Sequence, residues 1–190
     1  MLAAAQGLLF ACRIPTESLA CGRTIQSMTN DEKPIDLTSD EYFMGEALRL
    51  ARSAYEADEV PVGAVIVHGG KIIARAHNQV ETLKDATAHA EILAITQAAS
   101  ALGDWRLEGC TLFVTKEPCP MCAGAIMLSR VKRLVFGVRD DRVGAAGTVF
   151  PIASATGLNH VLEVGAGVME TEARDLLQSF FRTKRSTPQT

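Results

Sequence analysis

Two short, almost uninterrupted apolar runs constrain the fold of this chain more than any other feature. They are residues 111–115 (Thr-Leu-Phe-Val-Thr) and 134–138 (Leu-Val-Phe-Gly-Val). Strands that are apolar along their whole length are typical of a sheet that is covered on both faces. A helix from about Pro120 to Ser129 is expected between the two runs, which predicts a right-handed β-α-β crossover joining parallel strands. The chain therefore needs helices on both sides of a sheet.

The other periodic segments complete a sandwich around that sheet. Thr38 and Glu41 have the spacing of a capping box and predict that a helix starts at Thr38. The tetrapeptide His68-Gly69-Gly70-Lys71 predicts a hairpin turn. We expect a three-layer α/β/α sandwich with a mixed central sheet of about five strands. The remaining predicted elements are strands at 60–67, 71–76 and 161–164, a helix at 88–102 with Ile92, Leu93, Ile95, Ala99 and Leu102 inward, and a helix at 170–185 with Leu176, Leu177, Phe180 and Phe181 on one inward stripe.

Composition and charge exclude several classes of protein. Hydrophobic residues make up 47% of the 190 residues and charged residues 22%, which excludes a disordered chain. The net charge of −3 excludes a polycationic coat for nucleic acid but leaves room for a local basic patch. No apolar run approaches the ~18–20 residues of a membrane span. Five cysteines, an odd number, do not suggest a disulfide framework, so we expect a reducing compartment, the cytoplasm.

The first 36 residues differ from the rest and lack the basic stretch that opens a secretory signal. We expect residues 1–36 to be a dispensable extension, residues 37–186 to be the folded domain, and residues 187–190 to be a tail. Acidic residues are few in this extension, so organellar import is the alternative to a cytoplasmic location.

The pentapeptide Pro118-Cys119-Pro120-Met121-Cys122 predicts a pair of metal-binding thiolates. Proline suits the first turn of a helix, where its missing N–H costs nothing. Residues three apart share one face of a helix, so both sulfurs are expected to point the same way. The dipole and the free N–H groups of a helix N-terminus favour thiolates, the form that binds metal.

His89-Ala90-Glu91 supplies the remaining chemistry. An imidazole from His89 and two thiolates make a site that suits zinc, and three protein ligands leave a fourth position for water. Glu91 lies two residues further along, so it reaches the same site only over the N-terminal end of the helix. A carboxylate there is suited to take a proton from zinc-activated water and to return it to the substrate. The two motifs together match the signature of zinc nucleobase deaminases.

The chain resembles the tRNA-specific adenosine deaminase family, within the cytidine-deaminase-like fold, from about Asp40 to Arg185. The resemblance implies that adenosine at the wobble position of a tRNA anticodon is converted to inosine by a homodimer with one Zn²⁺ per subunit. The similar stretches are residues 59–65, 77–78, 87–91, 117–125, 139–140, 144–147, 159–160 and 180–182.

The resemblance also implies roles for individual residues. By position, the zinc ligands are His89, Cys119 and Cys122, and Glu91 is the proton shuttle. The implied substrate contacts are Asn78, which hydrogen-bonds the flipped base, the main chain of Ala90, which lines the pocket, and Asp140 and Phe181, which touch the anticodon stem-loop together with the basic tail.

One residue departs from the family pattern and another is shared with a different group of deaminases, so other functions stay open. Lys116 stands where the family usually has an apolar residue beside the base pocket, and Pro120 also occurs in free guanine deaminases of the same fold. One alternative function is deamination of a free base, guanine or cytosine. Another is a non-catalytic, zinc-stabilised module that binds tRNA, and a further one is a structural zinc site closed by Cys110 or His77. Asn78 is also typical of a turn.

Overall fold

The computed structural model describes residues 36–153, 155, 160 and 162–186. The chain divides into two units between Pro34 and Ile35, and every described residue belongs to the second unit. The expected extension therefore lies outside the described residues apart from Asp36, and so does the expected tail, residues 187–190. No helix in the described part of the chain combines the length and apolar composition of a transmembrane span.

Five strands form one mixed sheet in the order β2-β1-β3-β4-β5. β1 runs antiparallel to both β2 and β3, while β3, β4 and β5 run parallel to one another. The crossover between β3 and β4 carries α4, so the predicted parallel pair is confirmed. The elements are α1 (Asp40–Glu56), β1 (Gly63–His68), β2 (Lys71–His77), α2 (Val80–Leu83), α3 (Ala90–Leu102), β3 (Thr111–Lys116), α4 (Pro120–Leu128), β4 (Arg133–Val138), β5 (Glu163–Ala166) and α5 (Glu170–Ser186).

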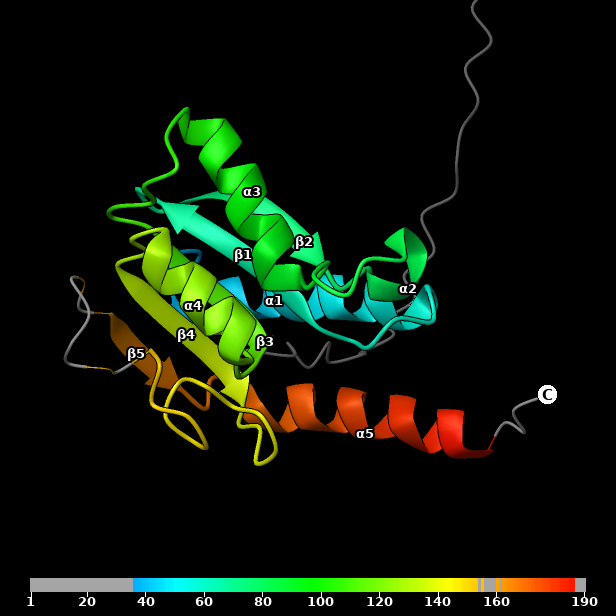
Figure 1. Ribbon diagram of the computed structural model, residues 1–190. Coiled ribbons are helices and arrows are strands. Elements are labelled where there is room, and N and C mark those ends of the chain that lie inside the picture. Colours follow the sequence, from blue (N-terminus) through cyan, green and yellow to red (C-terminus); the bar gives the residue numbers. More distant parts are fainter. Residues whose placement is uncertain (1–35, 154, 156–159, 161, 187–190) are drawn as a thin grey trace, which may run out of the picture. The chain divides into compact units, whose positions relative to one another are not determined.

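Helices cover both faces of the sheet, α1 and α5 on one side and α3 and α4 on the other (Figure 1). Successive residues of β1 point to opposite layers, as the pleat requires. Ala64 and Ile66 join the core under α3 and α4, whereas Val65 and Val67 pack with α1. Because both faces of β1 and β3 are buried, these strands carry no polar alternation. The predicted three-layer sandwich is confirmed.

Several predicted boundaries shift by one to three residues. The first helix is capped by Ser39, whose Oγ accepts a hydrogen bond from the Tyr42 N–H at 3.1 Å. The expected cap at Thr38 is wrong, because that hydroxyl bonds the carboxylate of Asp36 instead. β1 begins at Gly63 rather than at residue 60, since Pro61 has no N–H to give to a sheet ladder. The last strand covers 163–166 instead of 161–164.

The hairpin between β1 and β2 has the predicted two-residue turn. Gly69 and Gly70 both have positive φ angles, 56° and 74°, which suit the turn type that matches the twist of paired strands. Gly103 ends α3 in the left-handed conformation, also as predicted. The inward face of α3 differs from the prediction. Its fully buried aliphatic side chains are Ala90, Ala94 and Ala98, with larger residues packed partly buried beside them, and Ile92 is not part of that core.

Candidate metal centre and active site

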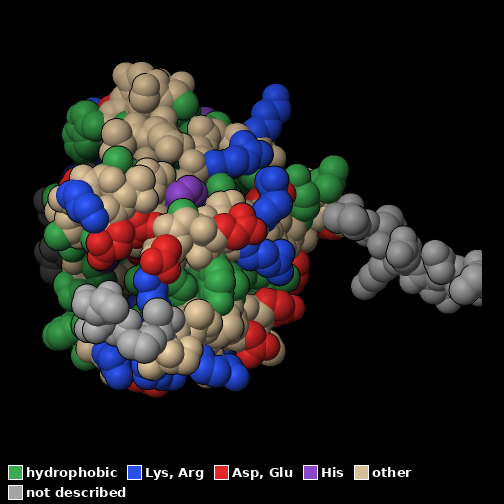
Figure 2. All heavy atoms as spheres, turned by 90° about the vertical axis from the view of Figure 1, so that its right-hand side faces the viewer, with side chains coloured by type: hydrophobic (Ala, Val, Ile, Leu, Met, Phe, Trp, Pro, Cys, Tyr) green, Lys and Arg blue, Asp and Glu red, His purple; other side chains and the backbone are tan. Residues whose placement is uncertain are grey.

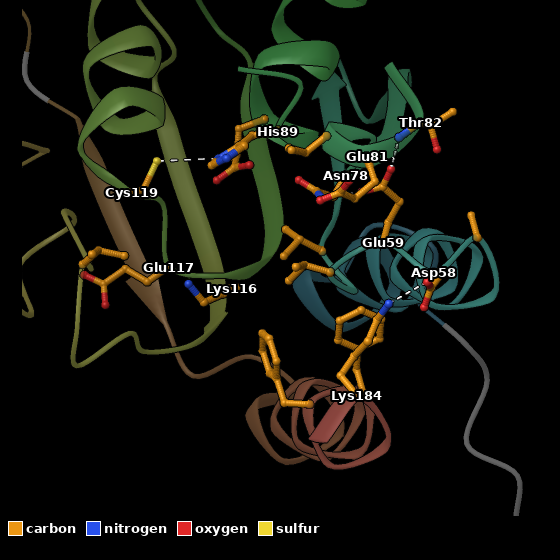
Figure 3. Close-up of a pocket in the computed structure, with 18 of the residues that line it drawn as sticks. Asp58, Glu59, Asn78, Glu81, Thr82, His89, Lys116, Glu117, Cys119 and Lys184 are labelled. Carbon is orange, nitrogen blue, oxygen red and sulfur yellow. Dashed lines mark hydrogen bonds and ion pairs between the residues drawn. The ribbon is translucent and has the colours of Figure 1, made fainter. Parts of the chain in front are cut away.

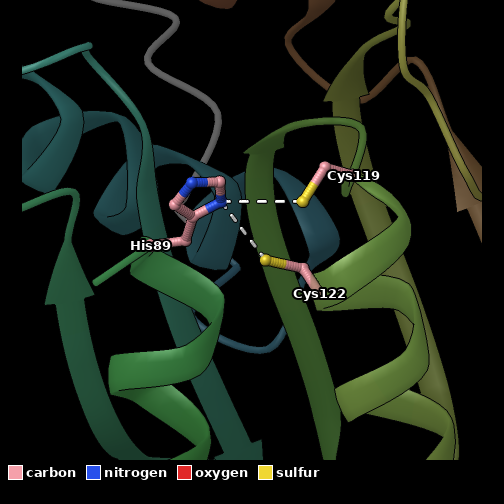
Figure 4. A group of neighbouring side chains, drawn as sticks. All are labelled: His89, Cys119 and Cys122. Atoms are coloured by element: carbon pink, nitrogen blue, oxygen red, sulfur yellow. Dashed lines mark hydrogen bonds between the residues drawn. The ribbon is translucent and has the colours of Figure 1, made fainter. Parts of the chain in front are cut away.

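The N-terminal ends of α3 and α4 meet on the same side of the sheet. His89 is the N-cap residue of α3 and Cys119 is the N-cap residue of α4. The two side chains point toward each other, and Cys122 joins them from the first turn of α4 (Figure 4). Pro120 occupies the first position of α4, where no N–H is needed. The predicted convergence of two helix ends is confirmed.

The spacing of the three side chains fits a zinc ion. Nδ1 of His89 lies 3.4 Å from Sγ of Cys122 and 3.6 Å from Sγ of Cys119. Zinc bonds of about 2.3 Å to sulfur and 2.0–2.1 Å to nitrogen, at a tetrahedral angle, place such a pair roughly 3.5 Å apart. All three ligand atoms lie within 4.8 Å of one another. The donor set and its geometry therefore suit a tetrahedral site with three protein ligands.

A fourth protein ligand is not present among the described residues. Cys110 is buried in the hydrophobic core, and Nδ1 of His77 lies 2.9 Å from the carbonyl oxygen of Asn78. Neither residue belongs to the metal-binding group, which within the described residues consists of one histidine and two cysteines. The alternative of a closed structural site with Cys110 or His77 is therefore wrong. Two of the three ligands, His89 and Cys119, line the pocket described below.

The pKa values of the three ligands are shifted because their side chains hydrogen-bond one another. The hydrogen bond from Cys122, together with one from His89, lowers the pKa of the Cys119 thiol to about 4. The hydrogen bond to Cys119 raises the pKa of Cys122, because it stabilises the protonated thiol as donor, and burial raises this pKa further. The hydrogen bond to Cys119 raises the pKa of His89. A divalent cation stabilises both thiolates, so this crowding of sulfur atoms is the condition that a metal relieves.

Glu91 lies in the first turn of α3, next to the metal ligands. Its side chain is 4% exposed, and its carboxyl group hydrogen-bonds the thiol of Cys122. Burial raises the pKa of Glu91 above its ordinary value. The prediction that Glu91 reaches the site over the end of the helix agrees with this position. A buried carboxyl group beside an open metal corner can hold a proton and release it again.

A cavity of about 830 Å³ opens onto the metal ligands. Its walls come from the loop after α1, from α2 and the residues on either side of it, from the starts of α3 and α4, from the end of β3, from the loop after β4, and from α5 (Figure 3). The volume exceeds what one base fills, so the cavity has room for a base and its neighbours in a chain. The residues that line it and enter the argument are Glu59, Asn78, His89, Glu91, Lys116, Glu117, Cys119, Phe181 and Lys184.

Asn78 lies in the wall of the cavity and is held there by a residue that the sequence did not reveal. Its amide Nδ2 donates a hydrogen bond of 3.1 Å to Glu59, which also accepts one of 2.7 Å from the Thr82 N–H. Glu59 is 1% exposed. Burial alone raises the pKa of Glu59, but the hydrogen bonds from Thr82, Glu81 and Asn78 outweigh it and leave the pKa below the ordinary value. An ionised carboxylate can accept hydrogen bonds but cannot donate them. Glu59 therefore fixes the side on which the amide nitrogen of Asn78 lies.

Asp140 is buried, whereas a residue that contacts RNA is expected to be exposed on the surface. It is 8% exposed, and its carboxylate accepts hydrogen bonds from Lys116 and from the Arg142 N–H at 2.9 Å. Glu117, another residue that sequence reasoning missed, accepts the N–H groups of Asp140, Ala146 and Thr148 at 3.0–3.1 Å. The segment 140–148 is thereby tied to the edge of the cavity. The expected contact between Asp140 and RNA stays a prediction.

Phe181 lies in the wall of the cavity rather than on the predicted inward stripe of α5, and Ala90 lies in the core. Phe181 is 44% exposed and lines the cavity, so it does not belong to the inward stripe of α5, whose buried members are Leu177 and Phe180. Its ring lies edge-on to Phe180 with the centroids 5.4 Å apart. Ala90 is fully buried in the core and is not among the residues that line the cavity. A side-chain contact from Ala90 is excluded, and the expected contact of its main chain stays a prediction.

Comparisons with known proteins agree with this site. A family model described as the cytidine and deoxycytidylate deaminase zinc-binding region matches residues 37–138. The tRNA-specific adenosine deaminase of Bacillus subtilis (strain 168) is 52% identical over 149 residues, which cover 78% of this chain and 92% of the relative.

Two solved structures have the same fold. One comes from work on A-to-I editing by tRNA:A34 deaminases at the wobble position of transfer RNA; it has a TM-score of 0.69 at 46% identity and covers 72% of this chain and 99% of its own. The guanine deaminase of Nitrosomonas europaea has a TM-score of 0.67 at 30% identity, covering 86% of this chain and 96% of its own. The metal centre is a zinc site. Matched over most of its length, the chain belongs to the tRNA-specific adenosine deaminase family, within the cytidine and deoxycytidylate deaminase zinc-binding group.

Proposed function

We propose that this protein hydrolyses adenosine to inosine at the wobble position of a tRNA anticodon. The observation that carries the proposal is a three-ligand zinc site with a buried carboxyl group, Glu91, at its side and a large open cavity in front. Membership of the tRNA-specific adenosine deaminase family supports tRNA as the substrate. The reaction consumes one water and releases one ammonia for each adenosine.

The proposed mechanism divides the work among four residues. His89, Cys119 and Cys122 would hold the zinc ion, which would supply the acidity that lets a water attack an electron-poor ring carbon at neutral pH. Glu91 takes one proton from that water and gives it to the ring nitrogen, and it then transfers the second proton of the water to the amino group, which leaves as ammonia. The base leaves the anticodon loop to reach the site, which costs only a few kcal/mol because loop bases are already unpaired.

Substrate contacts are proposed for the wall and the mouth of the cavity. Asn78, with its amide fixed by Glu59, hydrogen-bonds the base. Phe181 lies exposed at the mouth, where a ring can stack on an unpaired base. Lys and Arg side chains gather at the lower edge of the face that Figure 2 shows, at the height of α5. The exposed cations of the last turns of α5 are Arg182, Lys184 and Arg185, suited to RNA phosphates.

We further propose that two copies pair through α4. This helix is apolar on every side, a pattern that is typical of a helix with all its faces covered. Met121 and Leu128, seven residues apart on one face, are nevertheless 37% and 76% exposed. A second copy of the same chain would cover that face in a symmetric dimer. Leu128→Glu is expected to turn a dimer into a monomer in light scattering, while Leu37→Glu, at another exposed leucine, leaves the mass unchanged.

The remaining expectations also stand as proposals. The family match begins at residue 37, which supports residues 37–186 as the deaminase domain. A deletion of residues 1–34 that retains deaminase activity would agree with that boundary. A cytoplasmic location fits the three free thiols of the described domain, and microscopy of the full-length chain with a C-terminal fluorescent tag tests it.

The decisive experiment compares substrates. Zinc-loaded protein is incubated with a tRNA that carries adenosine at the wobble position, and A-to-G changes are read by sequencing. Conversion of that single adenosine supports the proposal. Release of ammonia from free guanine or cytosine without conversion of the tRNA would favour the free-base alternative, which the likeness to a guanine deaminase keeps in view. Tight binding of tRNA with neither reaction would indicate a non-catalytic module.

A further inference from the structure

Three lysines line the cavity, and one of them is held differently from the others. Lys84 lies 3.5 Å from Glu81, and Lys184 lies 2.6 Å from Asp58. Those two carboxylates are 73% and 77% exposed, so water competes with the lysine in both pairs. The partner of Lys116 is Asp140, whose side chain is only 9% exposed. Lys116 therefore carries a positive charge at a fixed point of the wall.

The anchor of this lysine is itself rigid. Oδ1 of Asp140 accepts the N–H groups of Arg142 and Val143 at 2.9 and 3.4 Å, while Oδ2 accepts the ammonium group of Lys116. The backbone N–H of Asp140 is in turn bound by Glu117 at 3.1 Å. Burial alone raises the pKa of Asp140, but Lys116 and the backbone N–H groups outweigh it, so the carboxyl group stays anionic. A lysine held by such a group keeps its direction without a ligand.

Charge near the metal centre explains why a cation is needed there. Three carboxylates, those of Glu59, Glu117 and Asp140, are buried around the inner cavity. Zinc with two thiolates and a neutral imidazole adds no net charge. RNA brings a negative phosphate on each side of every nucleotide, and an inner cavity with only anionic side chains would repel it. Lys116 is 27% exposed, and Figure 3 shows its ammonium end between the metal ligands and α5.

We propose that Lys116 binds a phosphate group that flanks the nucleotide whose base enters the cavity. An ammonium group has three N–H donors, and the hydrogen bond to Asp140 uses one of them. Asp140 acts as the positioning residue, because it holds the lysine stem in the wall. The inference rests on the proposed function, since a free base carries no phosphate. The competing explanation is that the ion pair only ties the segment 140–148 to β3.

Salt dependence separates the two explanations. The dissociation constant of the holoenzyme is measured across a KCl series for the product stem-loop, in which inosine replaces the adenosine so that nothing turns over. Each phosphate neutralised in a single-stranded segment contributes about 0.7 to the slope of log K against log [salt]. Lys116→Met is expected to flatten the slope by about 0.7 and to weaken binding roughly tenfold at low salt. Lys116→Arg should keep the slope.

Controls exclude general effects of charge and stability. Lys71→Met removes an exposed lysine at the far end of the β1–β2 hairpin and is expected to leave the slope unchanged. Zinc content and melting temperature are measured for each variant. A Lys116→Met protein with a lower melting temperature but an unchanged slope would show that the ion pair is only structural, and would overturn the inference.

A second arm needs no variant of the protein. Replacing each phosphate next to the target nucleotide in turn by an uncharged methylphosphonate should weaken binding to the wild-type protein at one position. The same replacement should add no further loss in Lys116→Met. Equal losses in both proteins would contradict the inference. A wild-type protein that does not convert tRNA would contradict the proposed function instead, so the two failures are distinguishable.

Discussion

Replacing Glu59 by glutamine removes one negative charge from a buried pair of hydrogen bonds and changes almost nothing in volume. The carboxylate of Glu59 accepts from the Thr82 N–H at 2.7 Å and from Nδ2 of Asn78 at 3.1 Å. A glutamine side chain has one accepting oxygen and one donating NH₂ group. Two donors therefore face one acceptor, and either Thr82 loses its partner or the amide of Asn78 turns over to present its oxygen.

The first outcome is measured as a loss of melting temperature and the second as a fall in kcat/KM. A buried donor without a partner costs about 1–3 kcal/mol. In a domain of this size about 1 kcal/mol corresponds to 2–4 °C, so a loss of about 2 kcal/mol lowers the melting temperature by roughly 4–8 °C. If Asn78 turns over instead, its amide presents the wrong group to the base. We then expect kcat/KM for the tRNA to fall roughly tenfold, mainly through KM, with the zinc content unchanged.

The pH dependence follows from the sign of the pKa shift. The folded protein lowers the pKa of Glu59 below its ordinary value of 4.5. The stabilising effect of Glu59 is therefore fully present above pH 4.5 and is lost as the pH falls through the lower, folded-state pKa. The difference in unfolding free energy between the wild type and Glu59→Gln is expected to be constant near neutral pH and to shrink in acid.

Thermal unfolding at several pH values and steady-state kinetics measure these effects. Glu56→Gln is the matched control, because it makes the same chemical change at an exposed position near the end of α1. Its melting temperature and kcat/KM should equal those of the wild type. If Glu59→Gln behaved like this control in both measurements, the idea that Glu59 fixes Asn78 would be refuted.

Four further substitutions, the last of them a control for the third, test the metal site and the packing. Glu91→Gln is expected to lower kcat by about 10²–10⁴-fold while zinc, measured by plasma emission, stays bound; loss of zinc would mean that Glu91 is not the shuttle. Cys119→Ser should lose the metal and activity together, and a variant that keeps stoichiometric zinc would contradict the ligand assignment. Gly63→Ala places a Cβ against the backbone of α1 and is expected to cost roughly 3 kcal/mol in urea unfolding, whereas Gly45→Ala, with no atom within 4 Å, should stabilise by up to about 1 kcal/mol; similar effects of both would refute the packing argument.

The sheet and the metal ligands were predictable because each depends on signals close together in sequence. Continuous apolar strands indicate burial on both faces, and the turn glycines Gly69 and Gly70 indicate the hairpin. Cys119 and Cys122 share one helical turn, so their spacing alone brings the sulfurs together. His89 was predicted to join them because it begins a neighbouring helix. The structure shows why this holds: α3 follows β2 and α4 follows β3, and both strands run antiparallel to β1, so the two helices start at the same edge of the sheet.

The rest of the site depends on contacts between distant segments, which periodicity does not report. Glu59 and Asn78 are 19 residues apart, and Lys116 and Asp140 are 24 apart. The resemblance to the family includes Glu59 in the stretch 59–65, but nothing near it in sequence indicates that its carboxylate is buried against Asn78. Phe181 was placed on an inward stripe because it follows Phe180, but adjacent residues of a helix point about 100° apart, and only Phe180 faces the core.

The buried glutamates of this cavity show how surroundings assign different work to one side chain. Hydrogen bonds surround the carboxylates of Glu59 and Glu117, from Thr82, Glu81 and Asn78 in one case and from the backbone N–H groups of Asp140, Ala146 and Thr148 in the other. These bonds keep the pKa of each below its ordinary value, so both stay anionic and hold the wall in shape. Glu91 is as deeply buried, but its partners are its own N–H and the Cys122 thiol, and burial raises its pKa. A carboxyl group can exchange protons near neutral pH only if its neighbours do not hold it in the ionised form. In this cavity that group belongs to Glu91, beside the metal ligands.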